Sequence, residues 1–265
     1  GDGGDELFAG YERQRVMNIL RRFYSAPDWI KHILINKIFS KITPVEQKDS
    51  FFASVKRILS DVSTGYLPTY KRWVTNFNSD LLQQILSPDL LNEYHHHNSY
   101  RIVEECFAAC DDAINQSLNF ETRYYLPDDL LVKADRMSMG NSLEVRVPFL
   151  DHRIVEFASS LPVDFKIKGK TGKYVLRNLM KRYLPKEIIK KPKRGFSPPI
   201  KEWLKNELRE YCQDALLSSN VLNQYFNKGK IEKLLNEHYA GKRDFQYQIW
   251  TLLVFAQWMK LNKSQ

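Results

Sequence analysis

Apolar side chains recur every three or four residues along most of the chain, and this spacing predicts a largely helical protein. The clearest example is the stretch 200–212, which follows a proline-rich loop and is typical of a long amphipathic helix. Residues 249–261 predict a buried helix that is too short to cross a membrane. The apolar face of the first of these helices contains Ile200, Trp203, Leu204, Leu208, Tyr211 and Cys212.

The remaining pattern predicts further helices and a single short strand. One helix is expected to start at Pro88, because Ser87 is a favoured capping residue and proline suits the first helical turn. Another is expected to be capped by Thr171 and to end before Pro185. Only residues 164–168 look like a strand. The other helices are predicted over residues 6–23, 29–39, 100–118 and 172–183.

The composition is that of a globular protein. Of the 265 residues 43% are hydrophobic, which is enough for one large domain or two small ones. The three cysteines do not form a disulfide framework, so we expect a reducing, cytoplasmic location. The net charge of +9 would suit a polyanionic partner. However, the basic stretches lack interleaved aromatics and no zinc-finger or RNA-binding motif is present, so we expect neither a nucleic-acid nor a membrane partner.

The first eleven residues, GDGGDELFAGY, combine glycines and aspartates with the start of an apolar helical pattern. Glycine allows a close backbone approach, so successive N–H groups can surround an anion. Asp2 and Asp5 carry carboxylate oxygens of the kind that Mg²⁺ binds together with substrate phosphates. The same two residues could instead cap a helix. A phosphate and metal site and a helix cap are therefore both open at this point.

Three later segments place ionisable side chains within apolar stretches, at residues 123–139, 142–151 and 169–177. Buried charges are costly unless they are paired, so such residues either form structural ion pairs or line a site. For Glu144 and Arg146 we expect a structural ion pair.

Together with the opening turn, these segments resemble the synthetase domain of glutamine-dependent asparagine synthetases over essentially the whole chain. The family's turn reads Ser-Gly-Glu/Asp-Gly-x-Asp-Glu, and Gly1 falls at its second position. The family's pyrophosphate-binding loop (PP-loop, Ser-Gly-Gly-x-Asp-Ser) and its N-terminal glutaminase domain are absent from residues 1–265. The resemblance implies a mostly α fold, the helical C-terminal portion of a PP-loop ATP pyrophosphatase (adenine nucleotide α-hydrolase-like) α/β domain that lacks most of its parallel sheet. Residues 1–265 would then be a partial synthetase domain, inactive by itself.

The resemblance also implies a reaction and its participants. Family members use ATP and Mg²⁺ to convert aspartate into β-aspartyl-AMP and pyrophosphate, and ammonia from glutamine then displaces AMP. Asp2 would support formation and aminolysis of the adenylate, Asp5 would help to hold Mg²⁺, and Lys173 would contact the α-phosphate or pyrophosphate. The nucleotide contacts would be Gly1, Gly3 and Gly4. The residues expected near the substrate are Asp128, Asp129, Lys133, Asp135, Arg136 and Arg146.

The expected partners are these small molecules and the N-terminal part of the same chain, with a homodimer as a possible full-length form. Asp2 leaves the acceptor acid open, because several asparagine synthetases carry the longer Glu at this position. Relatives with Asp include enzymes of surface-polysaccharide and secondary-metabolite pathways, which act on other acids. The β-lactam synthetase branch carries Tyr here, and the acidic residue argues against it. A non-catalytic helical interaction module is a further alternative.

Two clusters of histidine and aromatic residues are expected to be structural and not to bind ligands. His95, His96 and His97 are consecutive and would point in different directions from a helix, so no metal site is expected there. The Trp and Tyr residues between positions 239 and 258 fall at helical spacing and are expected in the core. The loop at residues 193–196 resembles one near the mouth of the family's active site.

Overall fold

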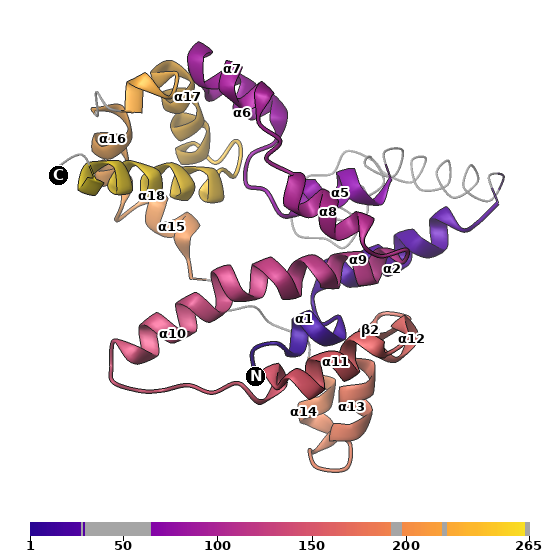
Figure 1. Ribbon diagram of the computed structural model, residues 1–265. Coiled ribbons are helices and arrows are strands. Elements are labelled where there is room, and N and C mark those ends of the chain that lie inside the picture. Colours follow the sequence, from indigo (N-terminus) through magenta and orange to yellow (C-terminus); the bar gives the residue numbers. More distant parts are fainter. Residues whose placement is uncertain (28, 30–64, 192–197, 219–221, 263–265) are drawn as a thin grey trace. The chain divides into compact units, whose positions relative to one another are not determined.

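The computed structural model describes residues 1–27, 29, 65–191, 198–218 and 222–262, and these residues are mostly helical (Figure 1). They divide into two compact units, unit 1 with residues 1–71 and 100–193, and unit 2 with residues 72–99 and 194–265. The sheet found in the described part is a two-stranded antiparallel pair, β1 (Ile167–Lys168) with β2 (Thr171–Gly172). The predicted mostly α class is therefore confirmed.

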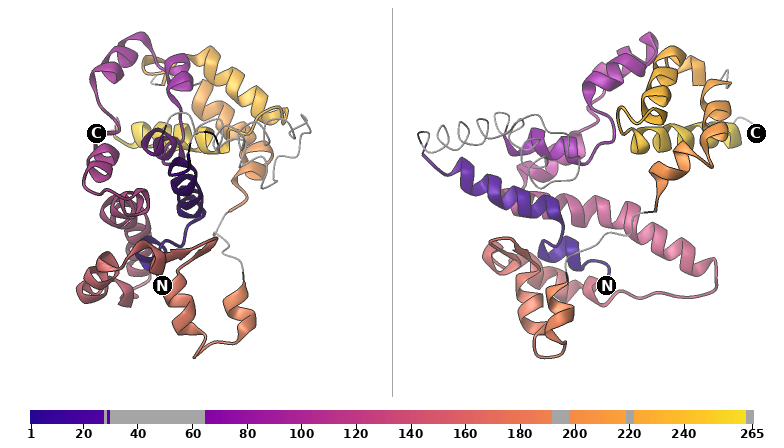
Figure 2. Two further views of the ribbon diagram at one scale, coloured as in Figure 1. Left: turned by 90° about the vertical axis from the view of Figure 1, so that its right-hand side faces the viewer. Right: turned by 180° about the vertical axis from the view of Figure 1, so that it is seen from behind.

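Unit 1 is built from short helices around one long helical rod. The rod consists of α9 (Ala113–Phe120), the π-helix η2 (Glu121–Leu131) and α10 (Val132–Met139), which follow one another without a break (Figures 1 and 2). Pro127 lies inside η2, and because proline has no amide hydrogen it cannot continue a regular α-helical ladder. The other elements are α1 (Gly4–Phe8), α2 (Glu12–Tyr24), α5 (Tyr66–Trp73, which ends in unit 2), α8 (Arg101–Ala108), η3 (Pro148–Leu150), α11 (His152–Ser160), α12 (Val163–Lys166), α13 (Tyr174–Met180) and α14 (Lys186–Lys190).

The opening turn is anchored in a small apolar cluster of unit 1. Leu7 and Phe8 of α1 are 4% and 2% exposed, and they pack with Ala158 of α11. Side chains of η3, α11 and α13 surround this cluster: Phe149, Leu150, Ile154, Val155, Leu161, Val175 and Leu176. The start of the chain is therefore fixed against residues that come about 150 positions later.

Unit 2 forms its own core around two long helices. Its helices are α6 (Ser79–Ile85), α7 (Pro88–His96), α15 (Ile200–Lys205), α16 (Arg209–Leu217), η4 (Leu222–Gln224), α17 (Lys228–Tyr239) and α18 (Gln246–Asn262). The start of α7 confirms the prediction, since Ser87 Oγ accepts a hydrogen bond from Leu90 N and Pro88 occupies the first turn. The core includes the fully buried Leu204, Cys212, Leu216 and Ile249.

Two predicted long helices are each divided by a local feature, a left-handed residue in one and a helix N-cap in the other. The helix expected over 6–23 is two helices, because Ala9 adopts a left-handed conformation (φ 57°) and ends α1. The helix expected over 100–118 is interrupted before Asp112, whose carboxylate accepts hydrogen bonds from Ile114 N and Asn115 N and so caps α9. Hydrophobic spacing alone does not detect either break.

Three further expectations need correction. The segment 164–168 is a helical turn that leads into a strand of only two residues, because α12 ends at Lys166. Thr171 lies in β2 and does not cap a helix; the residue before α13 is Lys173. The amphipathic stretch 200–212 is interrupted between α15 and α16, although Leu204 and Cys212 are buried as expected. The predicted helix at 29–39 lies outside the described residues.

The C-terminal helix α18 is buried along one side only. Ile249 and Leu252 are buried, whereas Tyr247, Val254 and Trp258 are more than half exposed. The expectation that all Trp and Tyr residues of this region belong to the core is therefore wrong for Tyr247, Trp250 and Trp258, because just one face of α18 packs on the unit 2 core. No helix in the described ranges has the length and apolar character of a membrane span.

Candidate active site

The opening turn is shaped by glycine and not by a side-chain cap. Gly3 precedes α1 with φ 84°, a conformation that favours glycine, and no side chain caps the helix. A methyl group at Gly3 would also lie 2.6 Å from Leu150 Cδ2. Asp2 is exposed, and Asp5 belongs to the first turn of α1. The helix-cap interpretation of the two aspartates is therefore not supported.

Asp5 forms an ion pair with Lys173. The distance from Lys173 Nζ to Asp5 Oδ1 is 2.9 Å, and the two side chains are 27% and 13% exposed. The backbone of Lys173 is held in place as well, because its N–H donates to Phe8 O at 2.9 Å and its φ of 52° starts α13 at this point. Residues 168 positions apart, both predicted from sequence, thus meet at the same turn.

Two glycines make this meeting possible. A methyl group at Gly10 would lie 1.9 Å from Asp5 Oδ1 and 2.3 Å from Lys173 Cε. At Gly172 it would lie 2.1 Å from Ala9 O, so that β2 approaches the end of α1 more closely than any side chain permits. Neither glycine was among the sequence-predicted site residues. In the sequence, Gly10 follows a predicted helix start and Gly172 precedes Lys173. Both patterns are also typical of ordinary turns, so they did not indicate a site.

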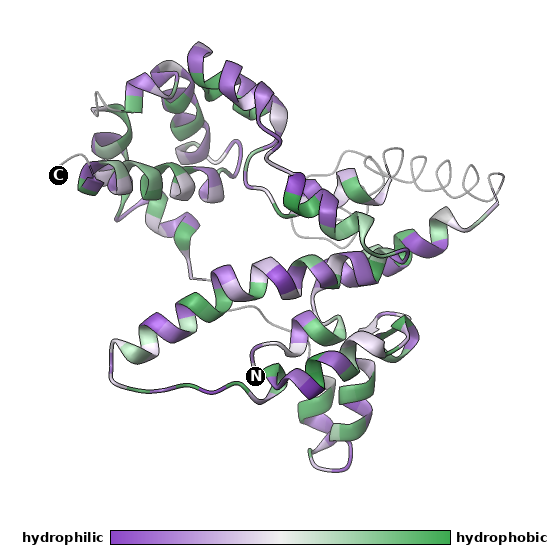
Figure 3. Ribbon diagram, in the orientation of Figure 1, coloured by the Kyte–Doolittle hydropathy of each residue, from purple (hydrophilic) through white to green (hydrophobic). Residues whose placement is uncertain are grey.

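Lys173, the cationic partner of Asp5, lines a cavity of 320 Å³ with apolar and basic walls. Gly1 and Gly4 belong to its lining, and a methyl group at Gly1 would lie 2.9 Å from the Phe149 ring. Figure 3 shows hydrophobic segments in green on both α13 and α14, which supply most of the other lining residues. These residues are Leu176, Arg177, Met180, Leu184, Ile188, Ile189 and Lys191. Such a lining suits a ligand that carries both an apolar group and negative charge.

A charged network supports the turn from within unit 1. Glu121 of η2 is completely buried; it accepts two hydrogen bonds from the Arg13 guanidinium and one from Tyr70 Oη at 2.8 Å. The Arg13 guanidinium also lies over the Tyr11 ring, 4.5 Å from its centre, and Tyr11 Oη donates to Glu6 in α1. Burial, together with the hydrogen bond to Glu6, raises the pKa of Tyr11. Sequence reasoning missed this network, because its members come from four separate helical segments and their neighbours.

The predicted substrate residues lie away from these interactions. Asp128 and Asp129 are exposed on η2, Lys133, Asp135 and Arg136 are exposed on α10, and Arg146 is exposed in the segment that follows. No hydrogen bond or ion pair within the described ranges joins any of them to the opening turn.

The predicted pair of Glu144 and Arg146 is confirmed. Their side chains meet at 2.8 Å, but they are 67% and 85% exposed. The premise that this pair is buried is therefore wrong, because the segment between α10 and η3 lies at the surface.

The three histidines are exposed at the C-terminal end of α7. His95 and His96 end α7, and the described residues contain no group of three or more potential metal ligands. The loop at 193–196 lies outside the described residues.

Comparison with known proteins identifies the family. The asparagine synthase family matches residues 1–260. The chain belongs to the asparagine synthase family. Asparagine synthetase (glutamine-hydrolyzing) 1 of Bacillus subtilis is 32% identical over 265 residues, which cover 99% of this chain and 40% of that protein. Chicken (Gallus gallus) asparagine synthetase (glutamine-hydrolyzing) is 31% identical over 156 residues, 53% of this chain and 28% of that protein. The human protein of the same name is 33% identical over 137 residues, 45% of this chain and 24% of that protein.

Membership of the asparagine synthase family confirms the resemblance drawn from the opening turn and the later segments. The chain spans 40% of the length of the Bacillus subtilis relative. No solved structure matches the chain significantly. The roles of individual residues therefore stay predictions from the family resemblance.

Proposed function

We propose that residues 1–265 form part of the synthetase domain of an ATP-dependent amidotransferase. In this proposal a carboxylate oxygen of the acceptor, L-aspartate first, attacks the α-phosphorus of ATP and releases pyrophosphate. Ammonia derived from glutamine then attacks the acyl carbon of the acyl-adenylate and releases AMP, which gives the amide. The observation that carries the proposal is that Lys173, paired with Asp5, lines a cavity together with Gly1 and Gly4.

Each of the residues predicted at the turn would have a role in this reaction. The Lys173 ammonium would stabilise negative charge that develops on the phosphoryl oxygens or on the departing pyrophosphate. Asp2, whose side chain is exposed, would accept a proton from the attacking ammonia. Gly1, Gly3 and Gly4 would allow the nucleotide to approach the backbone closely.

The donor set at the turn fits Mg²⁺ as a metal shared with substrate. Mg²⁺ is usually held by one or two carboxylates together with substrate phosphates and water. Asp5 supplies one partly buried carboxylate, and one of its two oxygens contacts Lys173, which lines the cavity. A bound Mg²⁺ would neutralise phosphate charge, and Asp5 is the residue that would hold it.

We propose further that the parts needed for a complete enzyme lie outside residues 1–265. These parts are the PP-loop, most of the parallel sheet of the ATP pyrophosphatase-type domain, and the glutaminase domain. The relative from Bacillus subtilis, of which the chain covers 40%, is long enough to contain all three. Residues 1–265 alone should therefore be inactive, and in the full-length form the six exposed charged residues near α10 would face the acceptor.

The test is the exchange of labelled pyrophosphate into ATP in the presence of an acceptor carboxylic acid. It is measured with the protein expressed from its complete reading frame. The expected result is exchange that requires Mg²⁺ and L-aspartate, with none from residues 1–265 alone. Absence of exchange with every acid of a broad carboxylate panel would contradict the proposed ligase function.

A second acceptor class is favoured by Asp2 alone. Its carboxylate is one methylene shorter than that of the Glu found in several asparagine synthetases, which leaves more room at the reacting carbon. In the same assay, a uronic acid or another carboxylate that supports faster exchange than aspartate would assign the enzyme to that class.

A further inference from the structure

A second cavity in unit 1 is separate from the one at Lys173. It has a volume of 610 Å³ and shares no lining residue with the first cavity. Its walls come from α1, α9, η2, α11, α12 and the turn before α9, all within unit 1. The proposed ligase reaction uses none of its charged residues.

Lys166 is the most unusual residue of this cavity. It is 3% exposed, and its ammonium donates a hydrogen bond to Asn115 Oδ1 at 3.3 Å. An ammonium group has three hydrogen-bond donors. Within the described ranges no carboxylate lies at ion-pair distance from the Lys166 ammonium. Burial lowers the pKa of Lys166. A buried cation with a neutral amide as its partner is costly, so the site favours an additional anionic group.

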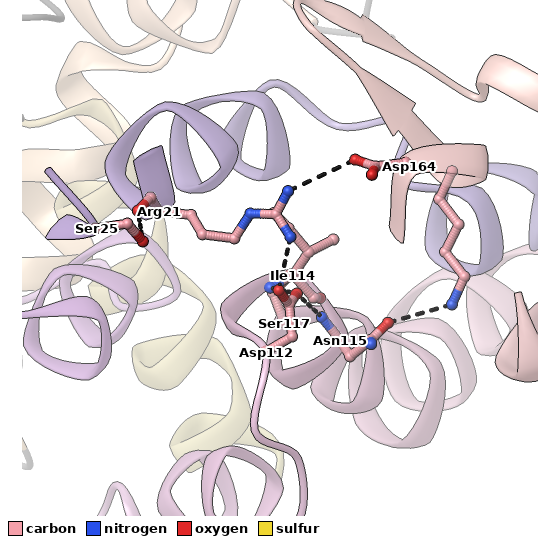
Figure 4. A network of polar contacts seen from close by, with 8 residues as sticks. Arg21, Ser25, Asp112, Ile114, Asn115, Ser117 and Asp164 are labelled. Carbon is pink, nitrogen blue, oxygen red and sulfur yellow. Dashed lines mark hydrogen bonds and ion pairs between the residues drawn. The ribbon is translucent and has the colours of Figure 1, made fainter. Parts of the chain in front are cut away.

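Asp112, the carboxylate that acts electrostatically on Lys166, does not fulfil this role, because it is already paired. Figure 4 shows Asp112 between Arg21 and the first residues of α9. Asp112 Oδ2 accepts from Arg21 Nη1 at 2.9 Å, and Oδ1 accepts from Ile114 N at 2.8 Å and from Asn115 N at 3.3 Å. The charge of Asp112 is therefore matched by other groups, although it still acts on Lys166 through space.

The other acidic residues of the lining do not pair with Lys166 either. Glu6 accepts a hydrogen bond from Tyr11, and Asp111 is exposed to solvent. Arg123 is exposed with its guanidinium near the Tyr124 ring, and among the described residues it has no ion-pair partner. The cavity thus contains two cationic groups whose charge is not matched by a carboxylate, one of them almost fully buried.

We propose that this cavity binds a small oxyanion, a carboxylate or a phosphate group, with Lys166 as its main charged contact and Arg123 as a second cation at the wall. The volume of 610 Å³ admits a small metabolite and not only an inorganic ion. Glu6 and Leu7 of α1 belong to the lining, so an occupant would contact the helix that also carries Asp5. Binding in this cavity would therefore affect the proposed active site through α1, which has residues at both sites.

The test is a titration of the full chain with sodium phosphate in one arm and sodium acetate in the other. Sodium chloride at equal ionic strength serves as the control, and the ¹³Cε resonance of Lys166 is followed by NMR. We expect a saturable shift with phosphate, acetate or both, which identifies the preferred oxyanion, and no saturation with chloride. A Lys166→Met variant should lose about tenfold or more in affinity, because a charge-assisted hydrogen bond is removed.

The matched control is Lys168→Met, which removes the same charge from an exposed position two residues away. It should leave the affinity unchanged within about twofold, in keeping with the small effect of exposed charges. No saturable shift in either arm, or an equal loss of affinity in both variants, would overturn the proposal. If Lys166→Met does not fold, the titration of the unaltered chain decides the question, with Lys166→Arg used to assign the resonance. Because binding is read directly, failure of the ligase proposal does not affect this result.

Discussion

Replacement of Gly10 by alanine should damage the candidate active site without touching a charged residue. The added methyl would lie 1.9 Å from Asp5 Oδ1 and 2.3 Å from Lys173 Cε. Gly10 does not have positive φ, so the backbone accepts alanine and only the contact is at issue. To reach an ordinary contact of 3.4 Å, the Asp5 oxygen must move by about 1.5 Å. This movement would disturb its ion pair with Lys173.

The magnitude follows from two opposing effects. Overpacking costs about 1–3 kcal/mol, and the reduced freedom of the unfolded chain returns about 0.4–1 kcal/mol. We therefore expect Gly10→Ala to lower the free energy of unfolding by about 1–2 kcal/mol in urea titrations. Pyrophosphate exchange by the full-length protein should fall about tenfold or more, since a displacement of the order of 1 Å at a reacting group is costly.

A matched control separates the contact from the substitution itself. Gly229 lies in α17, and a methyl group there would meet its nearest neighbour, Asn227 Oδ1, at an ordinary 3.6 Å. Gly229→Ala should leave exchange unchanged and stabilise the chain by about 0.4–1 kcal/mol. The reasoning is refuted if Gly10→Ala behaves like Gly229→Ala in both assays.

Three further predictions concern the network, a buried histidine and the thiols. Arg13→Met should cost about 3–5 kcal/mol in urea unfolding, because it leaves the buried Glu121 carboxylate without its cation; a loss below about 1 kcal/mol would contradict this reading. Burial lowers the pKa of His238, so its neutral form contributes stability that is complete above the unfolded pKa of about 6.5 and declines as the pH falls below it. His238→Gln should flatten that part of the stability profile, and an unchanged slope would argue against the assignment. Burial raises the pKa of Cys212 to about 11, so iodoacetamide at pH 8 should label Cys110 first, as peptide mass spectrometry can check; equal labelling rates would contradict it.

The sequence predicted the parts of the fold that depend on hydrophobic spacing. The helix that starts at Pro88 and the buried positions Leu204 and Cys212 follow from capping chemistry and from the apolar face. The breaks after Ala9 and before Asp112 were not predicted, because they depend on one left-handed residue and one carboxylate that accepts two N–H groups. Such local conformations are set by contacts that periodicity does not contain.

The candidate site was predicted in part for a similar reason. The resemblance to the family singled out Asp5 and Lys173, which the structure brings to 2.9 Å. Gly10 was missed, because a requirement for glycine appears only when the neighbouring side chain is known. Glu121 was missed as well, since it shares no local motif with its partner Arg13, 108 positions earlier. The roles of the exposed charges near α10 remain predictions.

The most direct test of the proposed active site is the effect of Lys173→Met on aspartate-dependent exchange of pyrophosphate into ATP by the full-length protein. The account predicts a loss of about 10²–10³-fold, as expected when a preorganised charge at the phosphoryl group is removed. The exposed Lys168→Met variant should retain the parental rate. Equal exchange by Lys173→Met and the parent would contradict the assignment of this turn to the chemistry of adenylation.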